Sequence, residues 1–130
     1  MTNRTQIALG NKTEESFTKL LQSYGWWCHL CARGQGGAQP CDVIAMKGTC
    51  NALIDVKHCV SDRFEFRRIE ANQHTSLQYA RFCGVQILGF AIYFEPIKEF
   101  RWLPYSVVEH CKNTKSISYE DLDNIEEVFK

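Results

Sequence analysis

Two aspartates and a lysine stand close together in the first half of the chain. Asp42 opens an apolar segment, Asp55 lies between two apolar residues, and Lys57 follows two positions later. Two neighbouring carboxylates repel each other unless one is protonated or a cation lies between them. Oxygen ligands of this kind favour Mg²⁺ or Mn²⁺, and a lysine beside the ion can orient a water or stabilise charge that develops on a phosphate. These residue types predict metal-assisted hydrolysis of a phosphodiester.

Two predicted strands, 42–46 and 52–57, carry these residues and are joined by a turn at Lys47-Gly48. Residues two apart in a strand point to the same face, so Asp55 and Lys57 are expected to project together. If the two strands pair as a hairpin, the first aspartate can approach the second. Two acids and a lysine also occur within sixteen residues by chance, as strand-end acids with a solvated lysine. The apolar surroundings favour the functional interpretation, because buried charge is costly unless it is paired.

The remaining elements must position this group. The expected order is helix, three strands, helix, strand and a variable end, which predicts an α/β layered domain. The helix before the fourth strand is a crossover, so the third and fourth strands could run parallel. Gly10 and Asn11 are expected to begin the first helix and Gly25 to end it, while 60–70 could be an extended arm or a short strand. We expect helices over 11–23, 71–83, 105–111 and 118–129, and strands over 26–32, 42–46, 52–57, 86–94 and 100–103.

Charge is balanced overall but unevenly distributed. The chain of 130 residues has 15 Lys or Arg and 15 Asp or Glu, a net charge of zero, which argues mildly against a bulk nucleic-acid binder. Residues 1–90 hold ten basic and seven acidic residues, whereas 91–130 hold five and eight. No segment approaches the roughly 20 apolar residues of a membrane span, and the N-terminus lacks a signal-peptide pattern. We therefore expect a cytoplasmic protein without a membrane partner.

The seven cysteines are the alternative source of a metal site. An odd number cannot pair completely within one chain, and without a secretion signal reduced thiols are expected. Cys28 and Cys31 with Cys41 and Cys50 could be a zinc site. Residues 28 and 31 would point to opposite faces of a regular strand, so buried free thiols are the favoured interpretation.

Several short motifs in order resemble the PD-(D/E)xK nuclease superfamily, and more closely its Holliday junction resolvases of the RecU and archaeal Hjc types. The similarity covers roughly residues 8–105. Each motif is loose, but their order and spacing together are fairly specific. The motifs are Gly10-Asn11-Lys12-Thr13-Glu14 for G-x-x-x-E, Gln39-Pro40-Cys41-Asp42 for the first aspartate, Asp55-Val56-Lys57 for E-x-K, Arg68-Ile69-Glu70-Ala71-Asn72-Gln73 before a helix, and Ala91-Ile92-Tyr93-Phe94 in the strand after it.

The resemblance implies a fold and a set of roles. The fold would be restriction-endonuclease-like, with three layers and a central mixed β-sheet flanked by helices. Asp42, Asp55 and the carbonyl of Val56 would bind Mg²⁺, with Mn²⁺ as a possible substitute, and Glu14 would join them directly or through water. Lys57 would position the attacking water. The predicted catalytic set is Glu14, Asp42, Asp55, Lys57 and Gln73, where Gln73 orients Lys57 or a water.

DNA contacts are predicted partly from this resemblance and partly from the distribution of charge. Arg33 matches a phosphate-contacting arginine of the family, and Arg67 and Arg68 belong to the most basic stretch. Lys12 and His74 are further candidates, although a histidine in such a position more often has a solvated or structural role. Phosphate contacts of this kind position DNA without reading its sequence. The chain lacks a long basic stalk, which leaves junction specificity more open than hydrolysis.

The predicted function is a Mg²⁺-dependent, structure-selective DNA endonuclease without a small-molecule cofactor. Its expected substrate is a branched, four-way DNA junction, and its expected assembly is a homodimer, as in a compact resolvase that a phage could encode and that would act in the host cytoplasm. The alternatives are another nuclease of the superfamily, which cuts flaps, ends or a defined sequence, or a non-catalytic DNA-binding domain on the same scaffold. We expect a single nuclease domain over 1–130, with a core at about 8–105 and a C-terminal helical extension at about 106–130.

Overall fold

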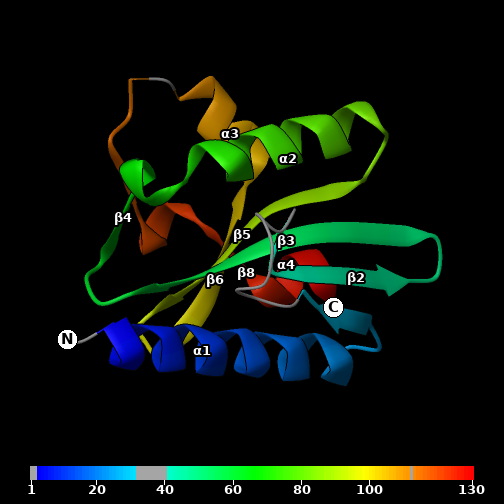
Figure 1. Ribbon diagram of the computed structural model, residues 1–130, viewed down its shortest axis with the longest axis horizontal. Helices are drawn as coiled ribbons and strands as arrows, with labels where there is room; N and C mark the ends of the chain where they lie inside the picture. Colours follow the sequence, from blue (N-terminus) through cyan, green and yellow to red (C-terminus); the bar gives the residue numbers. More distant parts are fainter. Residues whose placement is uncertain (1–2, 32–40, 112) are drawn as a thin grey trace.

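The computed structural model describes residues 3–31, 41–111 and 113–130, and the side chains of residues 3–8 are not among the described parts. A six-stranded mixed sheet forms its centre, in the order β1-β2-β3-β5-β6-β8 (Figure 1). The strands of this sheet are β1 (Trp27–Leu30), β2 (Val43–Lys47), β3 (Cys50–Cys59), β5 (Ile87–Phe94), β6 (Glu99–Pro104) and β8 (Asp123–Asn124).

A second, two-stranded sheet and four α-helices complete the described chain. The small sheet pairs β4 (Arg63–Glu65) with β7 (Ser116–Ser118). Two 3₁₀ turns are η1 (Phe66–Arg68) and η2 (Tyr119–Asp121). The α-helices are α1 (Asn3–Ser23), α2 (Ala71–Phe82), α3 (Tyr105–His110) and α4 (Ile125–Phe129).

The pairing of β2, β3 and β5 confirms the predicted hairpin and crossover. β2 and β3 run antiparallel, with Val43 opposite Ile54. β3 and β5 run parallel along eight paired positions, from Ala52 opposite Ile87 to Cys59 opposite Phe94, and α2 connects them. A parallel pair needs such a crossover because its strands begin at the same edge of the sheet.

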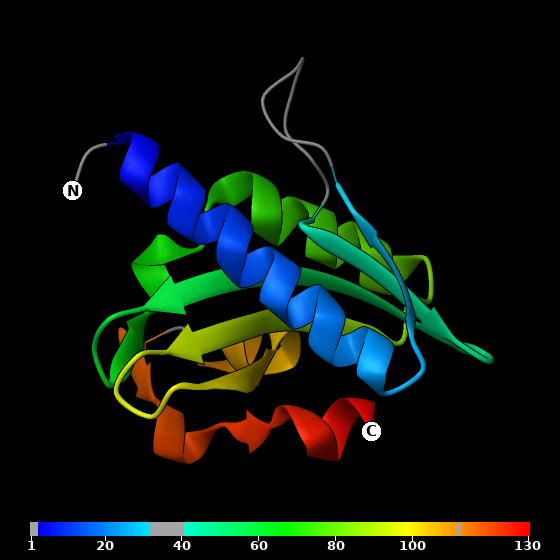
Figure 2. The same ribbon diagram turned by 90° about the horizontal axis from the view of Figure 1, so that it is seen from below.

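Helices cover both faces of the sheet (Figures 1 and 2). Each face has its own apolar core. On the α1 side, the helix residues Phe17 and Leu21 pack with alternate residues of β2 and β3 and with Phe129 of α4. On the α2 side, Leu77 packs with the other face of β5, with Tyr105 of α3 and with Phe64 of β4. Because side chains alternate along β3, Ala52, Ile54 and Val56 face α1, and Asp55 and Lys57 face α2.

The first helix is longer than predicted. It begins at Asn3, so that Gly10 lies inside it. A glycine within a helix costs only about 1 kcal/mol relative to alanine, which the burial of an amphipathic face readily offsets. Gly25 ends the helix as predicted, with a positive φ of 90° that favours glycine and with its N–H bonded to the carbonyl of Gln22.

The single terminal helix predicted over 118–129 is wrong. The hydroxyl of Ser118 accepts from the backbone N–H of Glu120, but the turn that it caps is only the short η2. The chain then becomes extended at Leu122. Leu122 belongs to the core on the α2 side, whereas Ile125 and Phe129 belong to the core on the α1 side. A straight helix could not reach both faces of the sheet, so the segment changes to β8 and α4.

Within the described residues, no helix is both long enough and apolar enough to cross a membrane.

Candidate active site

The β2–β3 hairpin brings the two aspartates together. Asp42 precedes β2, and its N–H donates to the carbonyl of Ile54 at 3.1 Å. Its carboxylate atom Oδ2 accepts from the N–H of Val56 at 2.8 Å, across the hairpin. Asp55 lies between these two backbone partners of Asp42. The register of the hairpin therefore sets the approach of the two carboxylates, as the spacing in the sequence predicts.

Asp55 is buried, with 2% of its surface exposed, and its Oδ2 atom has no hydrogen-bond partner among the described residues. Burial raises the pKa of this carboxyl to about 7; the nearby Asp42 also raises it, whereas Lys57 opposes the rise. An unpartnered, buried carboxylate oxygen beside a second carboxylate is costly. The arrangement is one that a cation or a bound proton would stabilise.

Lys57 is held in place from α2 and η1. Its Nζ donates to Oε1 of Gln73 at 3.0 Å and to the carbonyl of Arg68 at 3.4 Å. Burial lowers the pKa of the Lys57 ammonium, while Asp55 and Asp42 oppose that change. The ammonium therefore has a fixed direction, on the face of β3 that also carries Asp55.

Gln73 joins the lysine to the beginning of α2. The same Oε1 atom that accepts from Lys57 also accepts from the N–H of Glu70 at 3.0 Å, one turn before it. The N–H of Gln73 donates to the carbonyl of Glu70 at 3.0 Å. One oxygen atom of the side chain thus both stabilises the first turn of α2 and holds the lysine.

Glu14 is buried on α1, with 6% of its surface exposed. This helix packs on the face of the sheet opposite to Asp55 and Lys57. Among the described residues, no three Asp, Glu, His or Cys side chains lie close enough to hold one metal ion. The structure brings Asp42, Asp55, Lys57 and Gln73 together, and the role of Glu14, directly or through water, stays a prediction.

The donor atoms nevertheless fit a divalent cation. Asp42 and Asp55 supply hard oxygen ligands, and the free Oδ2 of Asp55 is a ligand atom without another partner among the described residues. Protein sites for Mg²⁺ commonly use one or two carboxylates, and water or substrate phosphate completes the coordination. A third protein carboxylate is therefore not required.

The predicted DNA contacts fall in different places. Arg67 and Arg68 lie on η1 beside Lys57 and are exposed, and Lys12 is exposed on α1. His74 packs on α3, where its Nδ1 lies 3.0 Å from the hydroxyl of Tyr105. Through this contact His74 links α2 to α3, and its role in DNA binding stays a prediction. Arg33 lies outside the described residues.

Two polar contacts near the site have no clear signal in the sequence. His58 lies on the α1 side of β3, where its Nδ1 is 3.0 Å from the hydroxyl of Thr13 and its Nε2 is 3.4 Å from Glu95. Glu65 of β4 forms an ion pair with Arg67. The alternation of Phe64 and Phe66 with charged residues predicts an exposed charged face here, but not which charges pair.

The zinc alternative is wrong. Cys41 is buried before the start of β2, whereas Cys50 is exposed at the start of β3, so the two lie at opposite ends of the hairpin. They cannot contact the same ion. Burial raises the pKa values of Cys28, Cys31 and Cys41, which favours neutral thiols.

Comparison with known proteins identifies the fold. No protein-family model matches the chain, and no curated protein sequence matches it. A solved structure does: Hjc from Archaeoglobus fulgidus, a Holliday junction resolvase from an archaeal hyperthermophile. The TM-score is 0.74 at 22% sequence identity, over 93% of this chain and 100% of that chain. The predicted α/β fold, a mixed sheet flanked by helices, is confirmed as the fold of Hjc.

Proposed function

We propose that the chain is a metal-dependent endodeoxyribonuclease that resolves four-way DNA junctions. The observation that carries the proposal is the group of Asp42, Asp55, Lys57 and Gln73 at the β2–β3 hairpin, in a chain with the fold of a Holliday junction resolvase. Fold alone does not define an activity, because one scaffold can carry several functions. The paired carboxylates and the half-buried lysine, which Gln73 holds in one direction, support hydrolysis in particular.

Each residue has a distinct part in the proposal. Asp42 and Asp55 would hold Mg²⁺ or Mn²⁺, together with the carbonyl of Val56, while Glu14 would act directly or through water. A bound divalent ion supplies positive charge for the phosphate and makes a water more acidic. Lys57 would orient the attacking water or stabilise the phosphate oxygens, because its ammonium lies on the same face as Asp55.

Gln73 would act as a positioning residue. Its Oε1 holds Nζ of Lys57 at 3.0 Å, so it limits the directions in which the ammonium can point. Orientation of this kind contributes to the rate only when it favours the transition state over the bound substrate. The expected effect of Gln73 is therefore on the rate of cleavage and not on DNA affinity.

A four-way junction is symmetric, and its resolution needs two coordinated nicks. Each copy of this chain carries one candidate site, so we propose a homodimer related by a two-fold axis. The dimer would place two sites on one junction, with Arg67 and Arg68 beside each of them as candidate phosphate contacts.

The test compares labelled four-way junction, flap and linear duplex, each incubated with Mg²⁺, with Mn²⁺ and with EDTA. Paired, symmetric nicks in the junction that require a divalent ion are the expected result. Cutting of flaps or linear duplex without cutting of junctions would indicate that the protein is a different kind of nuclease. Binding of DNA without cutting in any condition would indicate a non-catalytic domain.

Two variants test the site itself. Asp55→Asn should abolish cutting while junction binding in EDTA remains, because the amide cannot hold the ion as a carboxylate does. The exposed Asp123→Asn, on β8, is the matched control and should cut normally. Cutting that survives in Asp55→Asn would show that the site is elsewhere.

A further inference from the structure

A groove of about 620 Å³ begins at Lys57 and runs between α1 and the arm formed by β4 and η1. Leu9 and Gly10 of α1 form one wall. The other wall comes from the end of β3 and the arm, and it includes Lys57 together with Arg63, Arg67 and Arg68. The groove is continuous with the candidate active site, since Lys57 belongs to both.

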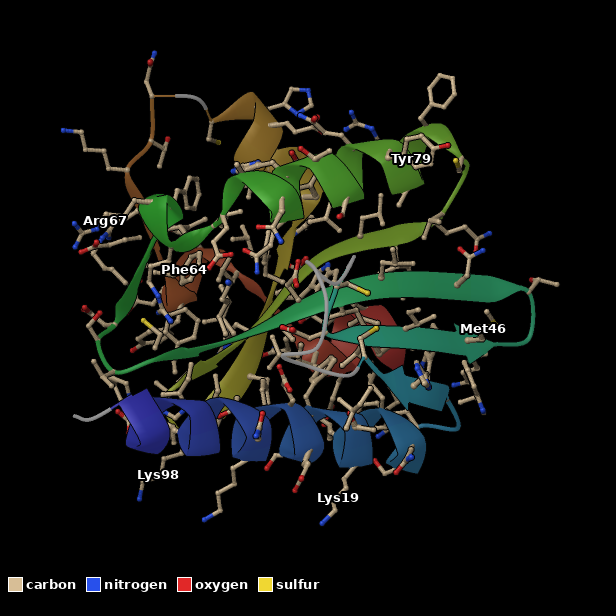
Figure 3. The ribbon with its side chains drawn as sticks, viewed as in Figure 1. Lys19, Met46, Phe64, Arg67, Tyr79 and Lys98 are labelled. Carbon is tan, nitrogen blue, oxygen red and sulfur yellow. The ribbon has the colours of Figure 1, made fainter. Side chains whose placement is uncertain are left out.

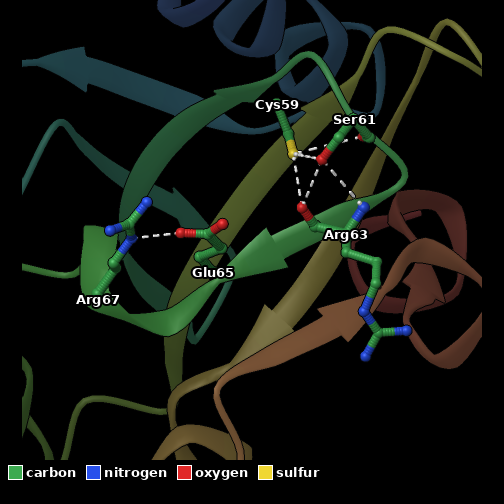
Figure 4. Close-up of polar contacts among 5 residues, drawn as sticks. All are labelled: Cys59, Ser61, Arg63, Glu65 and Arg67. Carbon is green, nitrogen blue, oxygen red and sulfur yellow. Dashed lines mark hydrogen bonds and ion pairs between the residues drawn. The ribbon is translucent and has the colours of Figure 1, made fainter.

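The arginines of the groove are held in different ways. Arg63 is anchored to β7, where its Nε donates to the hydroxyl of Ser116 at 2.9 Å. Arg68 lies over the ring of Phe64, with its guanidinium carbon 5.3 Å from the ring centre. Arg67 is paired with the carboxylate of Glu65, which also lines the groove (Figure 4).

Both members of this ion pair are accessible, because the side chain of Arg67 is 84% exposed and that of Glu65 is 49% exposed. Exposed ion pairs contribute only about 0–1 kcal/mol, so a phosphate can take the place of the carboxylate. In Figure 3 the labelled Arg67 points away from the body of the protein, at the outer edge of the arm.

We propose that this groove seats the sugar-phosphate backbone of one DNA strand next to the cleaved phosphate, and that Glu65 is a counter-charge which the phosphate must displace from Arg67. The inference rests on the proposed nuclease function and extends it to the path of the strand. Its support is charge complementarity, with four cationic side chains and one carboxylate along the walls, and continuity with Lys57. Glu65 thereby lowers the affinity for DNA, because its carboxylate competes with the phosphate for Arg67.

The test measures binding of a labelled four-way junction in EDTA over a range of salt concentrations. Glu65→Gln should raise affinity about two- to five-fold, because it removes the competing carboxylate. Arg67→Gln should lower affinity and reduce the slope of log K against log salt by about one, as the loss of one phosphate contact does. In the Arg67→Gln background the gain from Glu65→Gln should shrink, because part of it acts through Arg67.

The ion pair between Arg81 and Glu109 is the matched control, since it joins α2 to α3 away from the groove. Arg81→Gln and Glu109→Gln should leave both affinity and salt slope unchanged. Gly10→Leu should weaken binding several-fold by filling the groove from the opposite wall, whereas Asn11→Leu adds the same side chain at an exposed position outside it.

The outcomes separate this inference from the nuclease proposal. The proposal that the groove binds the DNA strand is overturned if Glu65→Gln leaves affinity unchanged or lowers it, or if Arg67→Gln leaves the salt slope unchanged. Either result counts even if the wild-type protein cuts junctions. The expected shifts in a protein that never cuts would keep the groove and reject the nuclease activity. Equal effects of Gly10→Leu and Asn11→Leu would also overturn the assignment of the strand to this groove.

Discussion

The burial of Asp55 on the α2 side of β3 links the ionisation of its carboxyl group to the stability of the protein. The folded pKa of about 7 lies well above the usual aspartate value of about 3.9. The folded state therefore binds this proton more tightly than the unfolded state. The stability that the proton provides is complete below pH about 4 and is lost as the pH rises through about 7.

The corresponding prediction concerns the free energy of unfolding in EDTA. Between pH 5 and pH 8 it should fall by an amount on the order of 2–4 kcal/mol, measured by urea titration. Asp55→Asn should remove most of this decrease, and Asp123→Asn should not. Addition of Mg²⁺ at pH 8 should restore stability to the wild type, because a cation favours the ionised carboxylates. An equal pH dependence in Asp55→Asn would contradict the prediction.

Gln73 allows a second prediction at this scale. Gln73→Ala should lower the cleavage rate by roughly 10- to 100-fold, a range typical of residues that orient a catalytic group, with junction affinity nearly unchanged. Gln73→Glu keeps an oxygen that can accept from Lys57 and should retain more of the rate. Single-turnover cleavage and binding in EDTA measure the two quantities separately. Equal losses of affinity and rate would indicate a purely structural role for Gln73.

The sequence predicts this group of residues well because the rules that position it are local. Alternation along a strand places Asp55 and Lys57 on one face, and a short hairpin brings Asp42 opposite. Contacts such as that of Thr13 with His58 join segments 45 positions apart. They depend on how α1 packs across the sheet, which no local pattern of residues specifies.

The C-terminal helix α4 gives a prediction at the scale of the elements. It is short, and its stability must come from packing rather than from helix propensity. The ring of Phe129 is 2% exposed and lies edge-on to Trp102 at 5.1 Å and to Trp26 at 5.4 Å. Its carbonyl also accepts from Nε1 of Trp26 at 2.7 Å.

We expect Phe129→Ala to lower the free energy of unfolding by about 3–5 kcal/mol, as the loss of a buried aromatic ring does. Phe82→Ala is the matched control, because the ring of Phe82 at the end of α2 is 90% exposed, and its effect should stay within about 0.5 kcal/mol. Urea unfolding followed by circular dichroism measures both. Similar values for the two variants would show that α4 is not part of the cooperative core.

Element boundaries are predicted best where periodicity is strong. The strand over 86–94 and the helix over 71–83 agree closely with β5 and α2. The error at 118–129 has a physical cause: Leu122 and Ile125 are three positions apart, as on one face of a helix, yet they belong to cores on opposite faces of the sheet. Apolar residues at helical spacing are expected to be buried, but the spacing does not show which core each residue enters.

At the scale of the whole molecule, the proposed homodimer predicts a specific dose dependence. In mixtures of wild type with Asp55→Asn, co-refolded or allowed to exchange subunits, each hybrid dimer has one intact site. Complete resolution of the junction should fall with the square of the wild-type fraction, while single nicks persist. Denaturing electrophoresis of junctions labelled on opposite strands measures both products. A linear fall in complete resolution would contradict two coordinated sites within one dimer.

The arm between β3 and α2 has one more consequence. Its tip at Val60, Ser61 and Asp62 is exposed, while β4 behind it is fixed to β7 and Arg63 is tied to Ser116. Residues inserted at this tip would extend outward without moving Lys57 or Gln73. Evolution, or a protein engineer, could therefore graft a longer recognition element here and change the preferred DNA shape while the hydrolytic machinery stays intact.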